Sequence, residues 1–131
     1  MILSQIINAL SLPREAILIG EAALDFELNQ ICIALTYEDL NAIDLNHALI
    51  VAPVDLFNSD PALEYFEILA RNDKVVSLLL TGPYKDIETS GIYKLCSKYN
   101  ITLCCLGELI SPVLVANKIM QVYKTHMGKL E

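Results

Sequence analysis

The sequence predicts a single α/β domain with a mostly parallel central sheet and helices on both faces. Three uninterrupted apolar runs, at residues 48–51, 75–80 and 101–106, are typical of strands that are covered on both faces. A helical pattern follows each run, and strands that alternate with helices through short links pair in parallel by crossover connections. The length of 131 residues fits one domain. We therefore expect a β-α-β-α-β-α core.

An N-terminal helix and two short strands are predicted before this core. Apolar residues recur at helical spacing up to Leu10, and Pro13 ends the helix because the residue before a proline leaves the α region. The short apolar runs at residues 16–19 and 31–35 predict the two strands. Residues 37–45 favour a short helix that leads into the first central strand.

The starts of the three core helices are marked by capping residues. Asp60 with Pro61 predicts an N-cap followed by proline in the first turn, and this helix is expected to end near residues 72–73. Ser90 is the expected cap of the second helix, and Ser111 precedes Pro112 at the start of the last one. The apolar positions of that last helix are Val113, Ala116, Ile119, Met120 and Tyr123.

Composition and charge argue against several classes of protein. Apolar residues make up 54% of the chain, which is typical of a folded domain. The net charge of −7 and the scattered basic residues argue against direct nucleic-acid binding. No apolar stretch approaches the roughly 18 residues of a membrane span, and the N-terminus lacks a basic start, so a cytoplasmic protein without membrane contact is expected. Residues 1–129 are the predicted domain, and residues 130–131 are either a natural end or a cloning remnant of a domain cut from a longer protein.

The residues that carry chemistry in other proteins are not grouped here in any recognisable motif. The four cysteines, at positions 32, 96, 104 and 105, lie in apolar runs without a Cys-x-x-Cys pair, so we expect them to be buried. His47 and His126 are the only histidines. The isolated glycines exclude a P-loop and a dinucleotide fingerprint, and no nucleophile elbow is present. We predict no catalytic residues, no metal and no cofactor.

A ligand site is expected where the central strands end. In open parallel sheets, small molecules bind outside the carboxyl ends of the strands. The same positions also suit the ordinary turns of such a fold, so both interpretations stay open. The candidate ligand-binding residues are Pro53, Asp55, Thr81, Gly82, Tyr84, Gly107 and Glu108.

Two short segments, one before the first central strand and one that includes it, resemble a known family. Residues 20–25 (Gly-Glu-Ala-Ala-Leu-Asp) look like a Gly-Leu-Asp segment, and residues 46–51 (Asn-His-Ala-Leu-Ile-Val) stand where that family has a Gly-Glu-Leu-Val-Leu strand. Residues 3–123 thereby resemble the N-terminal domain of PucR-type purine catabolism transcription regulators. The chain departs from the family at Ala23, where glycine is usual, and at residues 52–53, where Thr-Thr-Gly commonly ends the strand.

A second family shares part of this pattern. Residues 80–82 (Leu-Thr-Gly) are similar to the Leu-Thr-Gly turn of DRTGG-type regulatory domains, which have the same order of elements. Either resemblance implies a regulatory domain that senses a small metabolite or self-associates, with any DNA-binding helix-turn-helix in a separate C-terminal region. The alternatives are a small doubly wound enzyme and a dimerisation module without a ligand.

The last helix is also a candidate interaction surface. It is apolar on more than one face, so it either docks on a second copy or a neighbouring domain, or is buried in its own core. The residues that make it so are Val113, Leu114, Val115, Ile119 and Val122.

Overall fold

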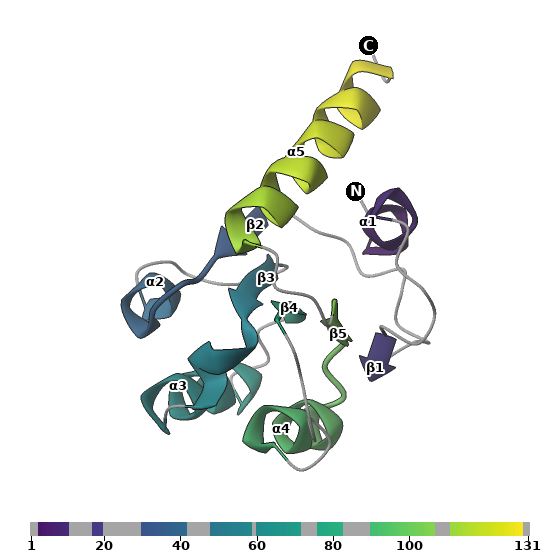
Figure 1. Cartoon of the computed structure of the whole chain (residues 1–131). Coiled ribbons are helices and arrows are strands. Elements are labelled where there is room, and N and C mark those ends of the chain that lie inside the picture. The colour runs from purple at the N-terminus through teal and green to yellow at the C-terminus, as the bar shows by residue number, and fades with distance from the viewer. Residues whose placement is uncertain are drawn as a thin grey trace.

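The chain folds as a five-stranded sheet with helices on both faces (Figure 1), which confirms the predicted α/β class. The computed structural model describes residues 3–10, 17–19, 30–41, 48–58, 60–71, 76–82, 90–106 and 111–129. The elements in chain order are α1 (Leu3–Ala9), β1 (Ile17–Ile19), β2 (Gln30–Ile33), α2 (Tyr37–Asn41), β3 (Ala48–Pro53), the 3-10 helix η3 (Val54–Asn58), α3 (Asp60–Arg71), β4 (Val76–Thr81), α4 (Gly91–Tyr99), β5 (Leu103–Cys105) and α5 (Pro112–Lys129).

The strand order across the sheet is β1-β5-β4-β3-β2. Strands β2 to β5 are parallel neighbours in chain order, with Ile50 beside Leu78 and Leu78 beside Leu103. Strand β1 is the exception, because it pairs antiparallel with β5 at the edge of the sheet. Strand β5 is shorter than its apolar run, although Leu78 N donates to the Thr102 carbonyl just before it.

The two faces of the sheet carry separate cores because successive side chains of a strand point to opposite sides. Ile50, Leu78 and Leu103 belong to the larger cluster, which α2, α3 and α4 cover. Leu49 and Leu79 belong to the smaller one, which α1 and α5 cover. In Figure 1, α3 and α4 lie on one side of the sheet and α1 and α5 on the other. We call these sides the α2–α4 face and the α1/α5 face.

Capping residues mark the starts of helices α4 and α5 and the end of α4. Ser90 accepts a hydrogen bond from Tyr93 N at 3.3 Å, and Ser111 Oγ accepts one from Val113 N at 3.2 Å. Helix α4 ends at Asn100, which has a φ of 57° in the left-handed region, and Ile101 N then donates to the Cys96 carbonyl at 2.9 Å. The predicted start of α3 at Asp60 is confirmed, and this helix ends at Arg71.

Two of the apolar positions expected to line helix α5, Ala116 and Ile119, are buried on the sheet, whereas Val113 and Met120 are not. Pro112, Val115, Ala116 and Ile119 are buried at helical spacing. Val113 and Met120 are each 40% exposed, because they lie further round the helix, away from the sheet. Tyr123 is in the part of α5 whose side chains are outside the described residues. Helix α2 ends at Asn41, and the rest of its expected range is also outside them.

Candidate functional site

The carboxyl ends of β4 and β5 form a topological switch point. After β4 the chain leads to α4, whose Ile92 and Cys96 pack on the α2–α4 face. After β5 it leads to α5, whose Val115 and Ile119 pack on the α1/α5 face. The connections after β2 and β3 lead to α2 and α3, which share one face, so only β4 and β5 diverge in this way. In open α/β sheets this is where ligands bind.

Thr81 and Gly82, two of the predicted ligand-binding residues, lie at this point. The Thr81 side chain is 3% exposed and points to the α1/α5 face, because it alternates with Leu80 of the opposite core. Gly82 has a φ of 109°, which side chains rarely adopt, and a Cβ built on it would meet nothing within 4 Å. Backbone conformation, rather than crowding, therefore accounts for the glycine.

Pro53 and Asp55 lie one strand away from the switch point. Pro53 is the register partner of Thr81, so these two residues are neighbours at the same end of the sheet. Asp55 is exposed in η3 and accepts a hydrogen bond from Asn58 Nδ2 at 3.4 Å. Tyr84, Gly107 and Glu108 are outside the described residues. The structure thus brings Pro53 and Thr81 together and places Asp55 on a neighbouring surface.

Buried hydroxyl groups follow the same face of the sheet. Among the described residues the buried polar side chains are Ser77, Thr81 and Thr102, and all three lie on the α1/α5 face by alternation with the opposite core. Ser77 Oγ is fully buried and has no hydrogen-bond partner in the described part of the chain. Buried hydroxyls are normally paired. The sequence indicates this buried hydroxyl, because Ser77 is the single polar residue in the apolar run at residues 75–80.

The N-terminus of α4 contributes a partial positive charge at the carboxyl edge of the sheet. Asn100 joins α4 directly to the amino end of β5, so the N-terminus of α4 lies toward the carboxyl edge of the sheet. Peptide dipoles give a helix N-terminus a partial positive charge, and the first turn of α4 contains no acidic residue to cancel it. Ser90 already accepts one of the N–H groups at this end.

The cysteines are confirmed as buried and free, and their environment makes them poor nucleophiles. Desolvation raises the pKa of the Cys96 thiol to about 12. The pKa of Cys104 is raised to about 12, mainly by burial and also by neighbouring Cys105. Burial, with the charge of Asp39, likewise raises the pKa of Cys32. These thiols stay protonated at neutral pH, and the thiolate is the reactive form.

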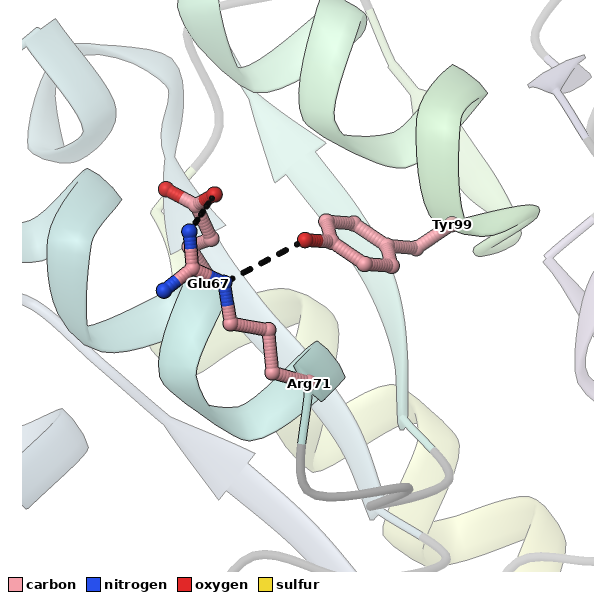
Figure 2. A network of polar contacts seen from close by, with 3 residues as sticks. All are labelled: Glu67, Arg71 and Tyr99. Atoms are coloured by element: carbon pink, nitrogen blue, oxygen red, sulfur yellow. Dashed lines mark hydrogen bonds and ion pairs between the residues drawn. The ribbon is translucent and has the colours of Figure 1, made fainter.

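A polar network on the α2–α4 face joins the ends of two helices (Figure 2). Arg71 Nη2 lies 2.8 Å from Glu67 Oε1 within α3, and Arg71 Nε donates to the Tyr99 hydroxyl of α4 at 3.4 Å. The bond to Tyr99 and the charge of Glu67 raise the pKa of Arg71. The Arg71 side chain is largely exposed, so the network ties α3 to α4 at the surface.

The cap of helix α2 is a feature that was not predicted from the sequence. Asp39 Oδ2 accepts hydrogen bonds from Leu35 N at 2.9 Å and Thr36 N at 3.1 Å. Thr36 and Asp39 stand at the spacing of a capping box, which was readable from the sequence. The carboxylate is therefore already occupied by backbone donors, and it serves the turn between β2 and α2.

The described residues contain no group of three or more His, Cys, Asp or Glu side chains able to bind a metal ion. Within the same residues, no helix has the length and apolarity required to cross a bilayer.

Comparison of the chain with protein-family models, with curated proteins and with solved structures finds no match.

Proposed function

We propose that this chain is a non-enzymatic regulatory domain that senses a small metabolite at the carboxyl ends of β4 and β5. The observation that carries the proposal is the switch point itself, where α4 and α5 diverge to opposite faces beside Thr81 and Gly82. The Thr81 hydroxyl can both donate and accept a hydrogen bond, and the backbone of Gly82 adds a donor and an acceptor. This combination suits the mixed donors and acceptors of purines and ureides.

The resemblance to PucR-type and DRTGG-type domains supports a regulatory role in the cytoplasm. In that role the domain would pass its ligand state to a DNA-binding region elsewhere in a purine-catabolism regulator. The charge of −7 supports a domain that does not itself contact DNA. A non-catalytic role is also supported by the high pKa of Cys96 and Cys104, because neither thiol is an activated nucleophile.

A thermal-shift titration with xanthine, allantoin and AMP tests the proposal. A ligand at a hundred times its dissociation constant stabilises the folded state by about 2.7 kcal/mol. We expect one of these probes to raise the melting temperature of the wild-type protein. Thr81→Val keeps the size of the side chain and removes its hydroxyl, so it should abolish that shift.

Ser97→Ala is the control, because Ser97 is exposed near the C-terminus of α4, away from the carboxyl ends of β4 and β5. We expect it to keep the full ligand-induced shift. Melting curves without ligand establish that both variants fold. The proposal is overturned if no probe shifts the melting temperature, or if Thr81→Val responds like the wild type.

A further inference from the structure

Large exposed apolar side chains occur on both sides of the sheet. On the α1/α5 face, Leu114 of α5 is 64% exposed, and Val113 and Met120 of the same helix are each 40% exposed. On the α2–α4 face, Ile68 of α3 is 51% exposed. Val113 and Met120 lie on one stripe of α5 and Leu114 lies about 100° further round the helix. Together they expose more apolar surface than the single apolar residues that are ordinary on proteins. Helix α5 therefore presents two sides, one buried on its own sheet and one exposed.

The two exposed surfaces differ in charge. Lys118 is exposed on helix α5, whose sequence contains no acidic residue, although the whole chain has a charge of −7. Helix α3 contains Asp60, Glu64 and Glu67 against one Arg71. Exposed Glu64 stands one turn before Ile68 on the outer side of α3, and exposed Lys118 stands one turn after Leu114 on α5. Leu114 is thus accompanied by a positive charge. Ile68 has the negative Glu64 one turn before it and Arg71, which is paired with Glu67, one turn after it.

One copy of the chain cannot bring these surfaces together. Helices α3 and α5 lie on opposite sides of the sheet, and the second half of α5 extends past it (Figure 1). Two copies can do so, because the basic, apolar side of α5 in one copy is complementary to the acidic outer side of α3 in the next. Complementary charges steer association and fix the orientation of partners.

We propose that the domain self-associates head to tail, with Val113, Leu114 and Met120 of one copy packed around Ile68 of a second copy. Lys118 then lies at the acidic side of the contact, near Glu64 of the other copy. In such an interface the α5 patch of one copy meets the α3 patch of the other. A pair therefore still has one free α3 patch at one end and one free α5 patch at the other. The association does not require a metabolite and is therefore independent of the proposed sensing function.

Sedimentation velocity of the purified full chain tests this interface. The mean mass should rise with protein concentration between about 10 µM and about 1 mM, the range of weak associations. The association should weaken between about 0.1 M and about 1 M salt, because the Debye length falls from about 10 Å to about 3 Å. Leu114→Glu and Ile68→Lys should each weaken self-association about tenfold or more, because each places a like charge in the contact.

Ser97→Glu is the control, since Ser97 is exposed on α4 outside both patches, and it should associate like the wild type. Mixing the two disruptive variants is the decisive step. Leu114→Glu keeps an intact α3 surface and Ile68→Lys keeps an intact α5 surface, so together they should form a one-to-one pair that grows no further. A monomeric wild type, unaffected variants, or a mixture that stays monomeric would each overturn the proposal.

Discussion

Replacing Ser77 with alanine should stabilise the protein. The Ser77 side chain is fully buried, and its hydroxyl has no hydrogen-bond partner among the described residues. Burial of an unsatisfied hydroxyl costs about 1–3 kcal/mol. Alanine retains the Cβ and removes one oxygen, whose space of roughly 15 Å³ costs only about 0.4 kcal/mol as a cavity. The net expectation is a gain of about 1–2 kcal/mol in the free energy of unfolding.

Urea denaturation at 25 °C measures this gain. With an m-value of about 2 kcal/mol/M, the midpoint of Ser77→Ala should rise by roughly 0.5–1 M while m is unchanged. Thr102→Val is the matched control, because Thr102 is in the same row of the sheet but has an interaction partner. That variant should lose stability. A neutral or destabilising effect of Ser77→Ala would refute the reasoning, since it would mean that the hydroxyl is paired in solution.

Two further changes test local structure. The backbone N–H groups of Leu35 and Thr36 lower the pKa of Asp39 below 3.8, so its stabilising effect is complete above that pH and is lost as the pH falls through the folded-state pKa. Urea unfolding should therefore show the largest difference between wild type and Asp39→Asn near neutral pH, and a difference that persists unchanged at pH 2 would contradict this. At the left-handed Asn100, alanine should cost about 1 kcal/mol and glycine almost nothing. Equal melting temperatures for these two variants would count against the assigned conformation.

The sheet and the helix starts could be predicted because their signals are local. Uninterrupted apolar runs mark strands that are buried on both faces, and the serines before α4 and α5 accept the first free N–H groups of those helices. The position of β1 beside β5 had no such signal. A three-residue strand at the edge of a sheet is placed by long-range packing rather than by its own sequence.

The candidate site could be predicted only in part for the same reason. Thr81 and Gly82 could be named as candidates because they follow the predicted strand at residues 75–80. The sequence did not reveal that α4 and α5 pack on opposite faces, and this divergence places the switch point at the ends of β4 and β5 rather than at the end of β3. It also could not show which stripe of α5 packs on the sheet, because two adjacent stripes of that helix are apolar.

The central claim is that a metabolite binds at the carboxyl ends of β4 and β5, and amide NMR mapping tests it most directly. The protein labelled with ¹⁵N would be titrated with xanthine, allantoin and AMP in turn. We expect saturable shifts of the amide signals of Thr81, Gly82 and Leu106, which lie at the ends of these two strands. Saturable shifts confined to the amides of η3 or α3, or no shifts with any of the three probes, would contradict it.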